Sequence, residues 1–172
     1  MNNLTVSRID RLMRLPVAHK TKEIDEYLDA KIGIMWATDE ITKNSQYLKI
    51  LHENLDELAE KTKEKRLRKI KKTEEELAAS KERLETCTKT YKDVEETAKK
   101  QMLERAREIA VEAGGTQYFD FLMEYRNKKQ QGTKLGMRYE DAYDVFKDLD
   151  SVLADKLRPA WNLILEIDDS PF

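Results

Sequence analysis

A basic run at residues 61–72 is the first feature of the sequence that could bind a partner. It holds eight lysines and arginines against Glu64, a local net charge of +7. Such a run can neutralise phosphates, with an affinity that falls steeply as salt rises, or it can dock on an acidic protein surface. No aromatic residue is interleaved for base stacking, so nucleic acid is not favoured, and a solvated helix end is the third alternative. The candidate partner-binding residues are Lys61, Lys65, Arg66, Arg68, Lys69 and Lys72.

The C-terminal stretch 139–172 is the opposite pole of the charge distribution. It carries nine acids against three bases, a net charge of −6. Opposite charges on one chain invite pairing, either internally or head to tail between copies. The acids lack the loop spacing and the terminal glutamate of an EF-hand, so we expect no calcium site.

Two pairs of carboxylates have a spacing that suits a metal ion. Glu23 and Glu26, and later Glu53 and Asp56, each place two acids on one helical face at i,i+3. The pattern resembles the ExxE…ExxD metal-binding pattern of the all-α nucleotide pyrophosphatases. The resemblance implies a magnesium-dependent nucleotide hydrolase in which two packed helices hold the ion with these four residues. Because related spacings recur elsewhere among the 34 acids of the chain, the hydrolase is the alternative function.

The remaining reactive side chains lack the neighbours that catalysis needs. His19 and His52 are the only histidines, and neither belongs to a metal-ligand pattern such as ExxH or HExxH. Cys87 has no histidine near it in the sequence to act as a base, and no glycine-rich phosphate loop occurs. We therefore expect no catalytic residue, no cofactor and no enzymatic activity.

The composition limits both the core and the broad functional class. Of 172 residues, 38% are charged, 40% are hydrophobic and 8% are aromatic, a balance that favours an elongated helical protein. The net charge of −2 means that any electrostatic function is local. A single cysteine cannot form an intramolecular disulfide, and no apolar run is long enough for a signal peptide or a membrane span. We expect a cytoplasmic protein that does not bind membranes, and a viral origin is a hypothesis.

The element that must position the basic run is the stretch Thr38–Ala113, which contains no glycine or proline and is predicted to be helical. Ile70, Leu77, Leu84 and Tyr91 recur every seven residues, and most positions three further on are small or polar. The spacing predicts a seam on which another helix can pack closely. Because an exposed apolar stripe of this length is a liability for a monomer, we expect a homo-oligomer that self-associates through these four residues.

The apolar pattern upstream is out of phase with this seam. Leu48, Leu51, Leu55 and Leu58 follow a spacing whose continuation misses Ile70 by one residue. A heptad pattern that loses phase must unwind, bend or reverse, and the slip falls inside residues 61–72. The central stretch is therefore predicted to be either one rod of about 114 Å or a hairpin with its joint near 61–72.

Short amphipathic helices are predicted on both sides. Residues 6–15 and 22–37 form two of them, with a helix junction near 33–38 and Trp36 buried between helices. Gly114-Gly115 is predicted to end the long helix, and the chain after Pro159 is predicted to be helical.

The expected core of the C-terminal module joins an aromatic helix at 117–126 to a helix at 139–157 that stops before Pro159. The residues predicted to face each other across this core are Tyr118, Phe121, Leu122 and Tyr125 on the first helix and Tyr143, Phe146, Leu149 and Leu153 on the second.

The sequence thus predicts an all-α, elongated fold in which one long helix or helical hairpin, coiled-coil-like, carries short flanking helices at both ends. The predicted domains are residues 1–37, 38–113 and 114–172. We expect a non-enzymatic protein that binds another protein in an assembly, adaptor or inhibitor role. Its alternatives are the magnesium-dependent hydrolase and nucleic-acid binding through residues 61–72.

Overall fold

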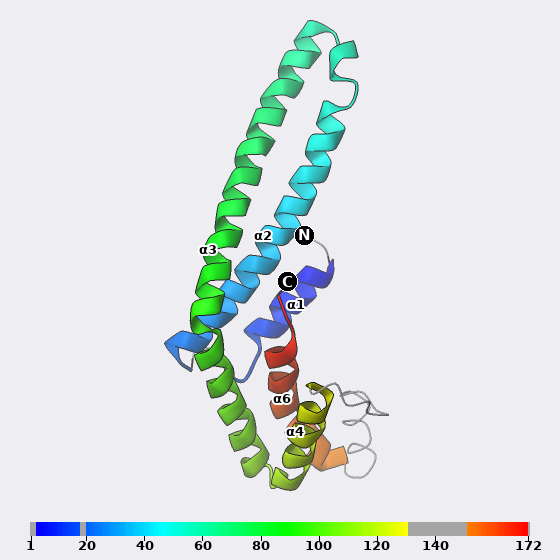
Figure 1. The fold of residues 1–172 in the computed structure, drawn as a ribbon. Helices are drawn as coiled ribbons and strands as arrows, with labels where there is room; N and C mark the ends of the chain where they lie inside the picture. The colour runs from blue at the N-terminus through cyan, green and yellow to red at the C-terminus, as the bar shows by residue number, and fades with distance from the viewer. Residues whose placement is uncertain (1–2, 18–19, 131–150, 172) are drawn as a thin grey trace. The chain divides into compact units, whose positions relative to one another are not determined.

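The computed structural model describes residues 3–17, 20–130 and 151–171, and these residues are helical without a strand (Figure 1). This confirms the predicted all-α class. The chain divides into two compact units. The first contains residues 1–14, 18–96 and 171–172, and the second contains residues 15–17 and 97–170. The predicted domain boundaries at 37 and 113 do not coincide with this division.

Helix α2 (Lys22–His52) forms one arm of a hairpin in the first unit. It begins at Thr21, whose hydroxyl accepts a hydrogen bond from the Ile24 amide at 3.2 Å. The expected helix junction near 33–38 is wrong, because α2 runs unbroken through it. Thr38 does not cap a new helix, since its hydroxyl donates to the Ile34 carbonyl oxygen at 2.8 Å inside α2, as threonine does in helix interiors.

Helix α1 (Asn3–Met13) packs against α2 in the same unit. It ends before Pro16, close to the predicted end at residue 15, and its Leu12 is buried. Trp36 was expected to be buried between helices, but it lies on α2 with 37% of its surface exposed. Trp36 is more exposed than expected because α2 continues past it, so the chain has no helix–helix junction there in which the indole could be buried.

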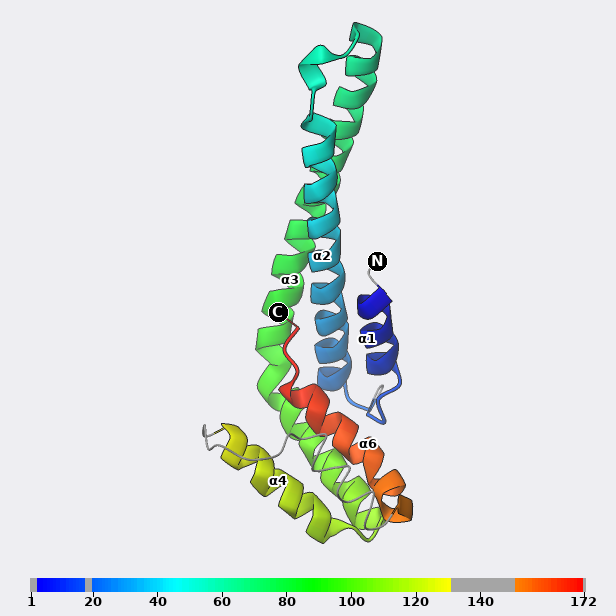
Figure 2. The same cartoon turned by 90° about the vertical axis from the view of Figure 1, so that its right-hand side faces the viewer.

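The chain reverses between α2 and α3 (Glu60–Glu112), through residues 53–59. Asn54 adopts a left-handed conformation with φ 52°, which asparagine tolerates better than most residues. A short 3-10 helix, η1 (Leu55–Glu57), follows. The Ala59 carbonyl oxygen then accepts hydrogen bonds from two backbone amides in the first turn of α3. In both Figure 1 and Figure 2, α2 and α3 lie side by side on either side of this turn.

The turn lies upstream of the predicted joint, and residues 61–72 are continuous helix in α3. The phase slip has another cause. The upstream leucines belong to α2 and the turn, whereas Ile70 and the residues after it belong to α3. Two antiparallel helices each keep their own phase, so the two patterns never had to be continuous.

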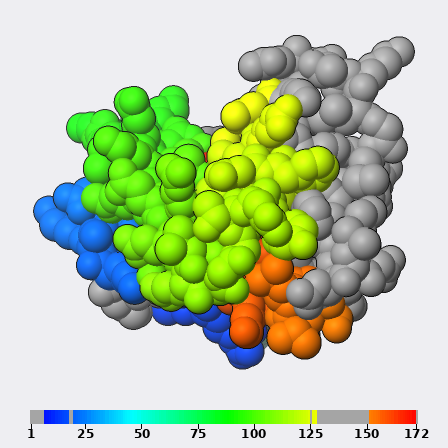
Figure 3. All heavy atoms as spheres, turned by 90° about the horizontal axis from the view of Figure 1, so that it is seen from below, coloured from blue at the N-terminus to red at the C-terminus, as the bar shows by residue number. Residues whose placement is uncertain are grey.

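In the second unit, α3 ends at the glycine pair, as predicted. Gly114 has φ 72°, the Gly115 amide donates to the Ala110 carbonyl oxygen at 2.9 Å, and the Gly114 amide donates to that of Val111 at 3.0 Å. These are the two bonds of a Schellman cap. A Cβ at Gly115 would lie 2.9 Å from the methyl groups of Leu157, so the lack of a side chain here lets α6 (Ser151–Asp168) approach the turn. Figure 3 shows the surface where this turn adjoins α6.

Helix α4 (Thr116–Gln130) buries a different face from the predicted one. Phe119 and Leu122 are buried, whereas Phe121 is 49% exposed, so the assignment of Phe121 to a core is wrong. The helix is apolar on more than one side, and periodicity alone did not determine which side turns inward. The side chain of Tyr125 and residues 139–150, with Tyr143, Phe146 and Leu149, lie outside the described residues.

Helix α6 does not stop before Pro159 as predicted, because the proline lies inside it. Proline removes one helical hydrogen bond, and burial of the flanking apolar residues offsets that loss. Leu157, Ala160 and Trp161 around the proline are all buried. A salt bridge joins Arg126 of α4 to Asp168 at the end of α6. Two nitrogen atoms of the Arg126 guanidinium donate to the Asp168 carboxylate oxygens at 2.6–3.0 Å. The helical end of the chain after Pro159 is confirmed.

Candidate interaction surface of the hairpin

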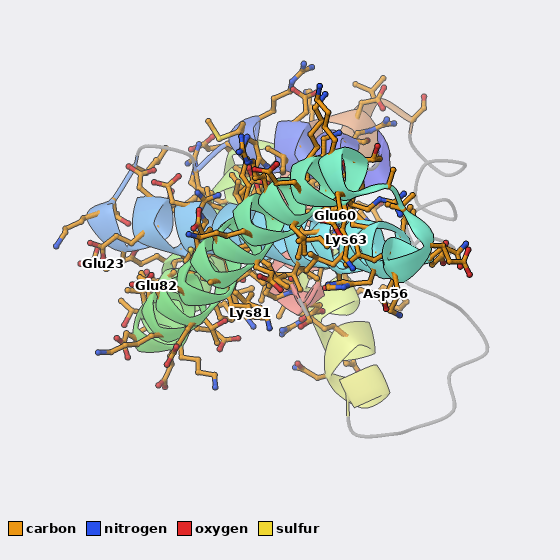
Figure 4. All side chains as sticks on the ribbon, turned by 90° about the horizontal axis from the view of Figure 1, so that it is seen from above. Glu23, Asp56, Glu60, Lys63, Lys81 and Glu82 are labelled. Atoms are coloured by element: carbon orange, nitrogen blue, oxygen red, sulfur yellow. The ribbon has the colours of Figure 1, made fainter. Side chains whose placement is uncertain are left out.

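The basic run occupies the first three turns of α3, next to the hairpin turn. Two of its members stabilise that turn. The Lys63 ammonium lies 3.1 Å from Asp56 Oδ1, a pair that Figure 4 shows at the end of the hairpin. The Arg66 guanidinium donates to the Glu53 carbonyl oxygen at 2.8 Å. Arg66, expected to bind a partner, therefore helps to hold the C-terminus of α2, where a cation is favourable.

Two further members form exposed ion pairs within α3. Arg68 lies 2.6 Å from Glu64, and Lys72 lies 3.6 Å from Glu76. Exposed pairs of this kind contribute about 0.2–1 kcal/mol. A partner carboxylate could replace either acid at little cost, so both bases stay available for binding.

Lys61, Lys65, Lys69 and Lys71 are exposed, and none has an acidic partner within the described part of the chain. Lys61, Lys65 and Lys69 follow one another at i,i+4, where like charges destabilise a helix by roughly 0.2–0.5 kcal/mol per pair. The helix thus presents adjacent positive charges that no ion pair within the described part of the chain neutralises.

The predicted oligomer seam is packed inside the hairpin. Ile70 and Tyr91 are buried, and Leu77 and Leu84 are half-buried. Tyr91 stacks on Tyr27 of α2 with ring centroids 5.1 Å apart, so the seam meets α2 of the same chain. Self-association was expected because an exposed apolar stripe is a liability for a monomer, and the hairpin covers that stripe. Self-association of the chain stays a prediction, but these four residues are already occupied.

Two small residues bring the helices together along this seam. A Cβ on Gly33 of α2 would overlap the Cys87 sulfur atom of α3. Cys87 is half-buried at this contact. Further along, the Ser80 hydroxyl donates to Glu40 Oε2 at 3.0 Å and Arg83 Nη1 lies 3.4 Å from the same oxygen. These contacts define the register of the two helices, that is, which residues of α2 and α3 lie at the same height along the hairpin.

Beside the basic run, α2 exposes apolar side chains that the sequence analysis did not single out. Tyr47 is 42% exposed and Ile50 is 55% exposed. A spacing signal was present, because steps of four, three, four and three residues place a single row on one side of a helix, and the row consists of Trp36, Glu40, Lys43, Tyr47 and Ile50. Lys43 on this row donates to Asp39 Oδ2 at 2.8 Å, a hydrogen bond that raises the pKa of Lys43.

The four carboxylates of the possible magnesium site do not meet. Glu23 and Glu26 lie in the first turns of α2, whereas Glu53 and Asp56 follow its last residue. The helix between them spans roughly 40 Å, and Figure 4 shows Glu23 and Asp56 at opposite ends of it. The resemblance to the pyrophosphatase pattern is therefore one of spacing without the required packing. Among the described residues, no group of three or more His, Cys, Asp or Glu side chains could hold a metal ion.

The acidic pole is only partly described, since residues 139–150 lie outside the described ranges. Of its remaining acids, Asp155 pairs with Arg158 at 2.9 Å and Asp168 pairs with Arg126. Glu166 is buried. Asp155 and Asp168 are thus paired within their own unit, and Glu166 is withdrawn from the surface.

A hollow of about 270 Å³ lies in the second unit between the end of α3 and α4. Leu103, Phe119 and Met123 line it together with Arg107 and two acids, Glu104 and Asp120. The mixed charges favour neither an anion nor a cation, and the hollow suggests no particular ligand.

Comparisons with known protein families, curated proteins and solved structures find no match to this chain. None of the described helices is long and apolar enough to cross a membrane.

Proposed function

We propose that this chain is a non-enzymatic protein-binding module whose hairpin end docks on an acidic surface of another protein. One observation carries the proposal: Lys61, Lys65, Lys69 and Lys71 are exposed on adjacent turns of α3 without an acidic partner in the described part of the chain. Carboxylates of a partner would relieve the repulsion between these lysines and pair with them.

The rigidity of the hairpin end supports this role. The Asp56 and Glu53 contacts of Lys63 and Arg66 tie the turn to the start of α3. The lysines therefore stand on a helix whose first turns contact the hairpin turn, and a helix that is already formed lowers the ordering cost of binding. An assembly, adaptor or inhibitor role would each use such a preformed docking end.

The alternative hydrolase is not retained, because it depended on carboxylates that lie at opposite ends of α2. Nucleic acid remains the competing occupant of the basic run. The acids Glu53, Asp56, Glu57 and Glu60 precede the lysines in the turn and at the start of α3, and they would repel a polyanion that continued past the lysines. A protein surface with a limited acidic patch avoids them.

The proposal is tested by charge reversal at the tip. Lys61→Glu, Lys65→Glu and Lys69→Glu are combined in a tip variant. The matched control combines Lys81→Glu, Lys89→Glu and Lys92→Glu, three exposed lysines further along α3. Both variants lose the same net charge, so non-specific electrostatics are equal in the two.

Wild type and both variants are used to capture proteins from an extract of the cells that naturally make this chain, after nuclease treatment. We expect an acidic protein that the tip variant captures at least about tenfold less than the control does, because three reversed charge pairs remove more than 1.4 kcal/mol. Equal capture by the two variants would overturn the proposal, as would a ligand that nuclease removes.

A further inference from the structure

A row of exposed side chains on α2 continues to the hairpin end. Trp36, Tyr47 and Ile50 are 37%, 42% and 55% exposed, and Glu40 and Lys43 stand between them on the same row. Steps of four and three residues keep all five on one side of a helix. The row spans about 21 Å from first to last residue.

The contacts of Glu40 show which side of the hairpin this row occupies. Glu40 accepts from the Ser80 hydroxyl at 3.0 Å and lies 3.4 Å from Arg83 Nη1. The row on α2 therefore runs beside the row on α3 that contains Arg83. Counting back from Arg83 by steps of seven, four, three and four residues, the α3 row continues through Glu76, Lys72, Lys69 and Lys65.

The same contacts fix the level of each residue along the hairpin. Since α2 and α3 are antiparallel, seven residues forward from Glu40 and seven back from Ser80 cover the same length, about 10 Å. Tyr47 is therefore level with Thr73, and Ile50 is level with Ile70. The 2.8 Å contact of Arg66 with the Glu53 carbonyl oxygen confirms this register at the tip side.

Two exposed apolar side chains of α2 thus lie along three lysines of α3 on one side of the hairpin. We call this surface the hairpin strip and define it as Tyr47, Ile50, Lys65, Lys69 and Lys72. Lys65 and Lys69 have no acidic partner in the described part of the chain, and Lys72 has only its exposed pair with Glu76. The strip is short, because Glu76 bounds the lysines on one side and the acids of the turn bound them on the other.

We propose that the hairpin strip binds an acidic amphipathic α-helix of the partner protein, a proposal that rests on the proposed function. The apolar stripe of such a helix covers Tyr47 and Ile50, and carboxylates along its edge pair with the lysines. Recognition of amphipathic helices uses apolar anchors at helical spacing, and charges at the rim of an interface add specificity. Tyrosine is also among the residues that contribute most to protein interfaces.

Charge complementarity and the aliphatic residue favour this occupant over nucleic acid. Phosphates along a nucleic acid are continuous, whereas the lysines of the strip end at acids on both sides. Ile50 has neither a ring for base stacking nor a hydrogen-bonding group for a base edge. A partner helix would bury Ile50, and a nucleic acid would leave it against water.

A random peptide display library tests the proposal with a defined probe. Peptides of about 18 residues, long enough for roughly 27 Å of helix, are selected on immobilised wild-type chain. We expect enrichment of acidic peptides whose apolar residues recur at i, i+3 or i+4, and i+7. Synthetic versions of the enriched peptides should gain helical circular dichroism when they bind.

Two variants then locate the contact. Tyr47→Ser with Ile50→Ser should weaken an enriched peptide by about tenfold or more. Leu67→Ser is the matched control, because Leu67 is 46% exposed in the same basic run but lies two residues from Lys65 and from Lys69 and so points away from their row. This control should change the affinity by less than about twofold.

The outcomes separate this inference from the proposed function. Acidic peptides without apolar periodicity, bound equally by wild type and the Tyr47/Ile50 variant, would overturn the hairpin strip and leave the proposed function intact. No enrichment of acidic peptides would overturn both. Tighter retention of a duplex DNA or RNA of about 20 base pairs than of the best peptide at the same salt would assign the lysines to nucleic acid and overturn both as well.

Discussion

At the scale of single residues, Gly33 allows α2 and α3 to approach closely at Cys87. A glycine in a helix interior costs about 0.5–1 kcal/mol relative to alanine, so its presence in the middle of α2 needs a compensating contact. The overlap that a Cβ would make with the Cys87 sulfur atom supplies the reason. Close packing of the two arms depends on this pair of small residues.

Gly33→Ala should therefore destabilise the protein by about 1–3 kcal/mol, as overpacking does, although alanine favours the helix. In a Cys87→Ala background the sulfur atom is gone, and the same substitution should instead stabilise by about 0.5–1 kcal/mol. Urea denaturation of the four proteins in this double-mutant cycle measures both effects. A Gly33→Ala effect of the same sign and size in both backgrounds would show that the contact with Cys87 is not the cause.

A second residue pair distinguishes the two faces of α4. Phe119 is 5% exposed and Phe121 is 49% exposed. Phe119→Ala should cost about 3–5 kcal/mol of stability, whereas Phe121→Ala should cost about 1 kcal/mol or less. Thermal unfolding of the two variants checks the order. If Phe121→Ala proves the more damaging, the buried face of α4 is the one that the sequence pattern first suggested.

At the scale of elements, the turn of the hairpin depends on the conformation of Asn54. Its φ of 52° is costly for residues with a branched Cβ, and the left-handed region costs ordinary L-residues about 1–2 kcal/mol. Asn54→Val should destabilise the protein by about that amount, whereas Asn54→Gly should change stability little because glycine adopts this conformation readily. Denaturation midpoints of the two variants test the prediction. Equal stability of the two would mean that the chain turns elsewhere.

The helix ends and turns also show which parts of the fold could be predicted from the sequence. Glycine pairs and caps act locally, so the end of α3 at Gly114 followed from the sequence. The turn at Asn54 did not, because one asparagine among polar residues is a weak signal and the phase slip pointed further downstream. A helix junction was expected near residues 33–38, whereas the reason for Gly33 lies 54 residues away at Cys87. Long-range contacts of this kind leave no local pattern.

The candidate site could likewise be predicted only in part from the sequence. Charge is a property of sequence, so the basic run could be recognised before the fold was known. Tyr47 and Ile50 join Lys65 and Lys69 only because the hairpin folds back with one register, which the Glu40 and Arg66 contacts fix. The contact of Arg66 with the turn could not be predicted for the converse reason, since the acceptor of its hydrogen bond is a backbone carbonyl oxygen that the sequence does not display.

At the scale of the whole molecule, the hairpin and self-association through the seam exclude each other, because Ile70, Leu77, Leu84 and Tyr91 cannot pack on α2 and on a second copy at once. If the hairpin is intrachain, the packing of this seam adds no concentration dependence to the stability of the chain. If copies complete the seam, each hundredfold increase in concentration adds about 2.7 kcal/mol, which would raise the Tm by roughly 5–10 °C for a chain of this length.

We expect the Tm to stay constant between about 1 µM and 100 µM, since the seam is already covered within one chain. Leu77→Asp with Leu84→Asp should lower the Tm at every concentration, because each carboxylate would enter a half-buried contact with no partner for its charge. Calorimetry across the concentration series measures both quantities, with Lys81→Asp and Lys89→Asp on the exposed side of α3 as the control. A Tm that rises with concentration in the wild type but not in the Leu77/Leu84 variant would show that these residues lie in an interface between copies of the chain.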